Sequence, residues 1–118
     1  MPRQLDVSIS ERVALARLAS DVIGVTDGVT PTTGPSGRWQ TTGSGQTVAG
    51  VLAVEDSQGH VDVELHLVAH WPPPTSLEEF GRQLRAQVRR AADNAGMGAR
   101  LGAVSVAFDD VLVETESD

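Results

Sequence analysis

A run of alternating residues from Val61 to Trp71 constrains the fold of this 118-residue chain more than any other stretch. Apolar side chains occupy every second position, and mostly carboxylate or imidazole side chains stand between them, in the order VDVELHLVAHW. A strand directs successive side chains to opposite faces of a sheet. The period of two therefore predicts a strand with one face in the core and one face toward water.

The residues around this run predict a hairpin. Val48–Glu55 is almost continuously apolar and reads as a strand that ends at a turn over Asp56–Gly59. The run 61–71 would then return antiparallel to it. Three consecutive prolines, 72–74, end the second strand because proline has no amide proton to donate to a sheet.

A first helix is predicted from about Ile9 to Ile23. Ser8 and Glu11 have the spacing of a capping box, and Gly24 stands where a helix ends. Its apolar residues fall on two stripes, one of Leu15, Leu18, Ala19 and Val22 and the other of Ile9, Val13, Ala16 and Ile23. We expect such a helix to be buried on more than one side. The alternative is that the stripe with Leu15, Leu18 and Val22 binds a partner.

A second helix begins at another capping box, formed by Ser76 and Glu79, and ends near Gly96 or Gly98. It carries one narrow apolar stripe, made of Leu77, Phe80, Leu84, Val88, Ala91 and Ala95. A last strand is predicted over Leu101–Val113, with a bulge or turn at its two aspartates.

Together these elements predict a single α+β domain over residues 1–118, with a folded core at 8–113 and an acidic tail at 114–118. The order is helix, possible edge strand, strand, strand, helix, strand. It predicts two layers, with both helices on one face of a three- or four-stranded mixed sheet. The possible edge strand lies in a Gly/Thr/Pro-rich loop at 26–47. There Trp39 should pack back onto the domain, or otherwise contact a partner.

Composition excludes several classes of function. The formal net charge of -7 argues against a nucleic-acid partner, because such binding depends on cationic side chains. The chain has no cysteine and no lysine, which excludes thiol chemistry, a Walker A loop and lysine Schiff bases. No catalytic or cofactor motif is present, so we expect neither enzymatic activity nor a cofactor. No run approaches the ~20 apolar residues of a membrane span. We therefore expect a cytoplasmic protein.

Two groups of polar side chains are candidate binding sites. His66 and His70 share a strand face with Glu64, but four residues of strand separate the histidines by about 13 Å. One ion cannot bind both, so we expect a solvated face without a metal. A stripe of Arg82, Arg85 and Arg89 is the second group.

The arginine stripe has two interpretations. Glu78 precedes Arg82 by four residues and Asp93 follows Arg89 by four, so both can form ion pairs on a solvated helix face. Alternatively, Arg82, Arg85 and Arg89 bind an anionic ligand or partner.

Three blocks resemble the alkaline shock protein family, the envelope stress response or general stress proteins of Gram-positive bacteria. They are Ile9–Ala16 with Ile23–Val25, the alternating run 61–71, and Leu84–Val88 leading into Gly96–Val106. The resemblance implies a non-enzymatic cytoplasmic protein at the inner face of the membrane. A membrane-anchored partner or paralogue would hold it there, and it would also associate with itself. The family has no catalytic residues to transfer to this chain.

Overall fold

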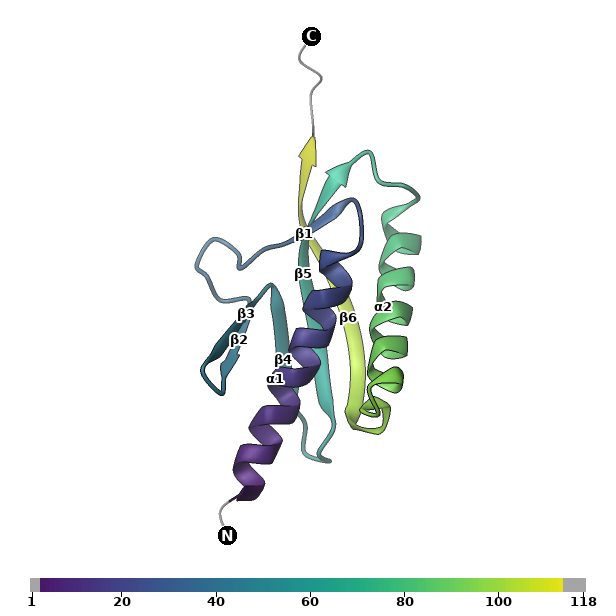
Figure 1. Ribbon diagram of the computed structural model, residues 1–118. Helices are drawn as coiled ribbons and strands as arrows, with labels where there is room; N and C mark the ends of the chain where they lie inside the picture. The colour runs from purple at the N-terminus through teal and green to yellow at the C-terminus, as the bar shows by residue number, and fades with distance from the viewer. Residues whose placement is uncertain (1–2, 114–118) are drawn as a thin grey trace.

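The computed structural model describes residues 3–113, and it describes side chains from Glu11 onward. The domain is α+β, as predicted, with both helices on one face of the main sheet (Figure 1). Its elements are α1 (Arg3–Gly24), β1 (Val29–Pro31), β2 (Gln40–Gly43), β3 (Gln46–Ala49), β4 (Val51–Glu55), β5 (Val61–Trp71), α2 (Leu77–Asn94), the 3-10 turn η1 (Gly98–Arg100) and β6 (Leu101–Val113).

The strand predicted first, β5, is the centre of a mixed four-stranded sheet. On one side, β4 pairs antiparallel with the first half of β5, and β1 pairs antiparallel with the second half. On the other side, β6 pairs parallel with β5 over nearly its whole length. The helix α2 is the crossover that makes this parallel pairing possible. The strands β2 and β3 form a separate two-stranded sheet.

The core lies between the helices and one face of β5. Every apolar residue of the alternating run except Val68 and Trp71 is buried, which confirms the period-two prediction: Val61, Val63, Leu65, Leu67 and Ala69. From α2, Phe80, Leu84 and Val88 pack against this face, and α1 adds Leu15, Ala19 and Ile23. The middle of the predicted apolar stripe of α2 is therefore in the core, whereas Ala95 follows the helix and is exposed, so the prediction was wrong at that residue.

The helix bounds differ from the prediction at one end. The helix α1 begins at Arg3 and not at Ile9, so the expected cap, Ser8, is inside the helix. Its side chain is outside the described residues. At α2 the cap is as predicted, because the Glu79 amide donates a hydrogen bond of 3.1 Å to Ser76 Oγ.

A glycine divides the strand predicted at 48–55. Gly50 has a φ of +77°, and a Cβ there would lie 2.5 Å from the Pro31 side chain. The chain therefore bends into β3 and β4 instead of continuing as one strand. The predicted edge strand near Trp39 exists as β2, but it pairs with β3 and does not extend the main sheet.

Side-chain hydrogen bonds fix two of the connections. Thr41 Oγ1 donates to the Val51 carbonyl at 2.7 Å and accepts from the Ala53 amide at 2.9 Å, which joins β2 to β4. At the β4–β5 turn, Asp56 accepts from the amides of Gln58 and His60. These backbone donors, Gln58 first, hold the pKa of Asp56 below its ordinary value.

The interruption predicted at Asp109 is a β-bulge. Phe108 is opposite Leu67, but the next pair joins Asp110 to Val68, so Asp109 is the extra residue on β6. Neither of the two described helices is long and apolar enough to span a membrane.

Candidate functional site

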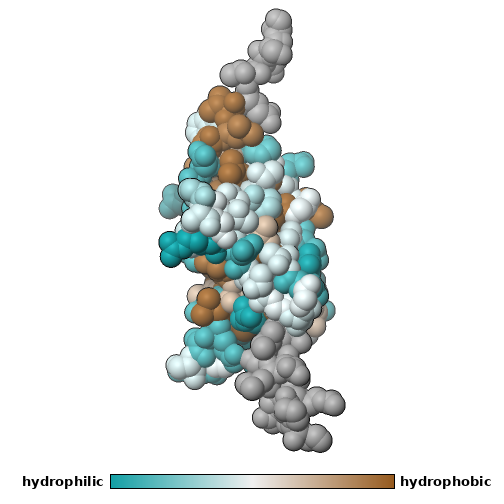
Figure 2. Space-filling view, turned by 90° about the vertical axis from the view of Figure 1, so that its left-hand side faces the viewer, coloured by the Kyte–Doolittle hydropathy of each residue, from teal (hydrophilic) through white to brown (hydrophobic). Residues whose placement is uncertain are grey.

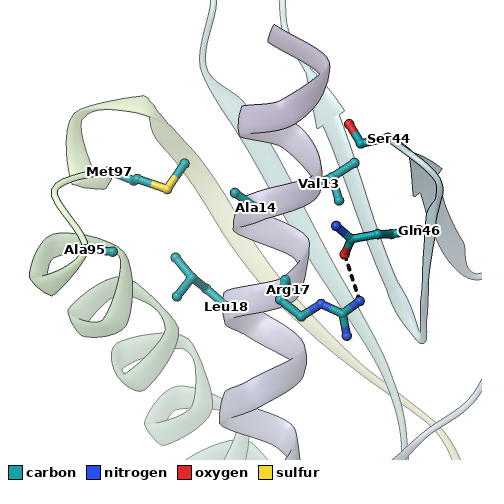
Figure 3. Close-up of a pocket in the computed structure, with 8 residues that line it drawn as sticks. All are labelled: Val13, Ala14, Arg17, Leu18, Ser44, Gln46, Ala95 and Met97. Atoms are coloured by element: carbon teal, nitrogen blue, oxygen red, sulfur yellow. Dashed lines mark hydrogen bonds between the residues drawn. The ribbon is translucent and has the colours of Figure 1, made fainter. Parts of the chain in front are cut away.

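A groove of about 400 Å³ crosses the outer surface of α1. Residues from three parts of the chain line it (Figure 3): Val13, Ala14, Arg17 and Leu18 of α1, Ser44 and Gln46 of the β2–β3 hairpin, and Ala95 and Met97 after α2. In Figure 3, Leu18, Ala95 and Met97 lie on one side of α1, and Ser44 and Gln46 lie on the other. The side with Leu18, Ala95 and Met97 is thus apolar, and the hairpin side adds polar groups next to Val13.

The polar side of the groove is built around Arg17. Its guanidinium donates a hydrogen bond of 2.9 Å to Gln46 Oε1, which links α1 to the hairpin. Within the described part of the chain, Arg17 forms no ion pair with a carboxylate. A cationic group therefore stands exposed beside an apolar surface.

Two arginines hold the walls of the groove in place. Arg12 donates to the carbonyls of Thr42, at 3.1 Å, and Ala53, at 3.4 Å, so α1 is tied to β2 and β4. On the other side, Arg100 forms a 2.8 Å ion pair with Glu11. These contacts keep the hairpin and the turn after α2 on either side of α1.

The apolar residues of α1 have different environments. Leu15, 1% exposed, and Val22 are in the core, so neither can contact a partner in this fold. The alternative prediction for these two residues was therefore wrong, because the sheet and α2 together bury this face of α1. Leu18 is half-buried and lines the groove. Of the three α1 residues considered as partner-binding, Leu15, Leu18 and Val22, it is therefore the one that remains accessible.

A second cluster, absent from the sequence-based prediction, surrounds His66. The imidazole is stacked on the Trp39 ring, with centroids 3.9 Å apart and planes 3° from parallel. Its Nδ1 lies 2.8 Å from Asp109 Oδ2, and its Nε2 lies 3.4 Å from Glu64 Oε1. His66 is only 4% exposed. The predicted solvated face was therefore wrong at this residue, because Trp39 covers it.

The main-chain groups of His66 also fix the loop 32–50 to β5. The Thr32 amide donates to the His66 carbonyl at 2.9 Å, and the His66 amide donates to the Gly50 carbonyl at 2.8 Å. Both ends of the segment 32–50 are thus fixed to β5 at one residue, and Trp39 packs between them. The prediction that Trp39 packs back onto the domain is confirmed.

The predicted arginine stripe is partly engaged within the domain. Arg82 pairs with Glu79 rather than with Glu78, and Arg89 donates to the Gly102 carbonyl at 2.7 Å. Arg85 is half-buried over Gly81, which lies near Phe108. Two of the three guanidiniums thus already have partners on the domain surface.

The outer edge of β6 is a third exposed feature. Among residues 3–113, no strand pairs with the side of β6 that faces away from β5. Its last residues are apolar and exposed: Val111, Leu112 and Val113, with Trp71 opposite Val113 on β5. Figure 2 shows apolar surface gathered at this end of the molecule. Exposed apolar surface at a free strand edge is characteristic of a protein contact.

No family model matches this chain, and neither a curated protein nor a solved structure does. Among the described residues there is no group of three histidine, aspartate or glutamate side chains that could hold a metal ion.

Sequence reasoning missed the groove and the His66 cluster for the same reason. Each joins residues that are far apart in the chain, and only the folded sheet brings them together. One local signal did exist for the groove, because Leu18 belongs to one of the two apolar stripes of α1. For the cluster, the signal was an isolated tryptophan in a Gly-rich loop beside a strand that carries a histidine.

Proposed function

We propose that this protein is a non-enzymatic interaction module that assembles with further copies of itself through the outer edge of β6. The observation that carries the proposal is a 13-residue strand whose outer edge pairs with no strand among residues 3–113 and which ends in exposed apolar residues. A free edge offers main-chain donors and acceptors to an added strand.

A second copy is a suitable occupant of this edge. When two identical strands pair antiparallel about a two-fold axis, one interface satisfies both edges. The regular segment Val104–Phe108 has no charged side chain, so two copies can approach there without repulsion between like charges. The exposed apolar end, Val111–Val113, adds surface whose burial favours association.

The environment of His66 supports a role without catalysis. The His66 imidazole lies against two carboxylates, those of Asp109 and Glu64, but a general base must reach its substrate. Its ring is stacked under Trp39, and Nδ1 contacts Asp109. We infer that His66 holds the loop 32–50 on the sheet rather than taking part in a reaction.

From the resemblance alone, we further propose a setting in envelope stress at the inner face of the membrane. A membrane-anchored relative would then be a second partner. A pull-down from membrane and cytosolic fractions of the native host tests this part of the proposal. Recovery of a small membrane protein or a paralogue supports it, and recovery of this chain alone from the cytosol contradicts it.

Light scattering after size-exclusion chromatography tests self-assembly. We expect the mass to rise with protein concentration, and to rise further with salt because the charge of -7 on each copy is then screened. Leu112→Lys should restore the monomer. Val54→Lys is a matched control, since Val54 is a 59% exposed strand valine on β4, and it should leave assembly unchanged. A monomer at every concentration and salt would refute the proposal.

A further inference from the structure

The groove over α1 has the chemistry of a small-molecule site that is separate from the β6 edge. Its volume of about 400 Å³ is within the usual range for ligand pockets, and most of its lining is apolar. The apolar residues converge from two elements that no local sequence signal joins: Leu18 of α1 with Ala95 and Met97 beyond α2.

Charge determines which class of ligand fits. The cationic group that lines the groove is Arg17, whose one hydrogen bond to the described residues goes to a neutral amide, Gln46. A guanidinium has five donors, so several remain for an anionic group. Gln46 and Ser44 add further polar atoms on the same side. An occupant should therefore have an apolar body and an anionic head.

We propose that this groove binds an amphiphile with an unbranched apolar chain and a terminal carboxylate. The chain would lie on Ala14, Leu18 and Met97, and the carboxylate would accept hydrogen bonds from Arg17. The carboxylate also matches the planar, two-pronged donor geometry of the guanidinium better than a hydroxyl does.

The chain offers a direct reporter of binding. It has two methionines, Met1 and Met97, and Met97 lines the groove. The methyl signal of Met97 in a methionine-methyl NMR spectrum therefore reports on the site. We expect decanoate, added below the concentration at which it forms micelles, to shift the Met97 methyl signal saturably.

The affinity should depend both on the length of the apolar chain and on the charge of the head group. Each methylene buried in the groove should improve affinity by about fourfold, so decanoate should bind about fifteenfold more tightly than octanoate. Decyltrimethylammonium has the same chain with a cationic head, and it should bind far more weakly than decanoate.

Two variants test the site itself. Arg17→Gln should weaken decanoate binding by about fivefold, because a partly solvated charge-assisted hydrogen bond is lost. Ala14→Trp should fill the groove and abolish the saturable shift. Ala86→Trp is its control, since Ala86 is an exposed alanine on α2 outside the groove. Because Arg17 is an exposed side chain, its variant keeps the test valid if Ala14→Trp does not fold.

Several results would overturn the proposal. They are equal binding of decanoate and decyltrimethylammonium, a Met97 shift that appears only above the micelle-forming concentration, and full binding by Ala14→Trp. The test is independent of assembly, because Leu112→Lys should leave decanoate binding unchanged.

Discussion

Replacement of Thr41 by valine removes a buried hydroxyl group that joins the β2–β3 hairpin to β4. Thr41 is 3% exposed, and its hydroxyl both donates to the Val51 carbonyl and accepts from the Ala53 amide. Valine has nearly the same shape and is more apolar. If burial of apolar surface alone determined stability at this position, the substitution would be neutral or stabilising.

The hydrogen bonds predict the opposite sign. Thr41→Val leaves two buried main-chain groups, one carbonyl and one amide, without their partner. Each such group costs roughly 1–3 kcal/mol. Some relaxation of the hairpin will occur, so we expect a loss of about 2–4 kcal/mol in the free energy of unfolding. Thr41→Ser keeps the hydroxyl and loses one methyl group, so it should cost only about 1 kcal/mol.

Urea unfolding followed by the fluorescence of Trp39 and Trp71 measures these differences. Thr47→Val is the matched control, because Thr47 is exposed on the neighbouring strand, and its effect should be within about 0.5 kcal/mol. Amide hydrogen exchange should show faster exchange at Ala53 in Thr41→Val. A valine variant as stable as the native protein, or more stable, would refute the reasoning.

Three further predictions concern other positions. Asp56→Asn should lower stability at neutral pH, and it should reduce the loss of stability on acidification below about pH 4. The reason is that the depressed pKa of the Asp56 carboxyl contributes stability, and this contribution disappears only as the pH falls through that pKa. Urea titrations at several pH values measure both effects. Gly50→Ala should cost about 2–4 kcal/mol by the same assay, since it combines a positive φ with a Cβ pressed against Pro31. Arg82→Gln should change the free energy of unfolding by less than about 0.5 kcal/mol, because its pair with Glu79 is exposed; a larger change in urea unfolding would contradict this.

The sequence predicted the elements whose patterns are local. The strand 61–71 has the predicted bounds because its alternation is set by one buried face. The helix α2 begins as predicted because Ser76 caps it through a contact three residues away. The predicted start of α1 was wrong. Ser8 has the capping-box spacing, but the helix continues back to Arg3, so Ser8 lies inside it.

The sequence could not predict features that depend on distant contacts. The bend at Gly50 reflects the close approach of Pro31, and nothing in the apolar run 48–55 indicates this. The burial of His66 depends on Trp39 from the loop. The groove requires α1, the hairpin and the end of α2 to be in place together. Leu15 could be assigned to the core or to a partner only once the sheet was known.

The most direct test of assembly at β6 is spin labelling, because the chain has no cysteine and a single introduced one can be labelled cleanly. Ser105→Cys puts the label on the uncharged segment of β6, and Ser57→Cys puts it on the exposed β4–β5 turn as a control. As protein and salt concentrations rise, the label at position 105 should lose mobility and show dipolar broadening, while the label at 57 should stay sharp. Spectra at both positions that are independent of concentration and salt would contradict assembly through this edge.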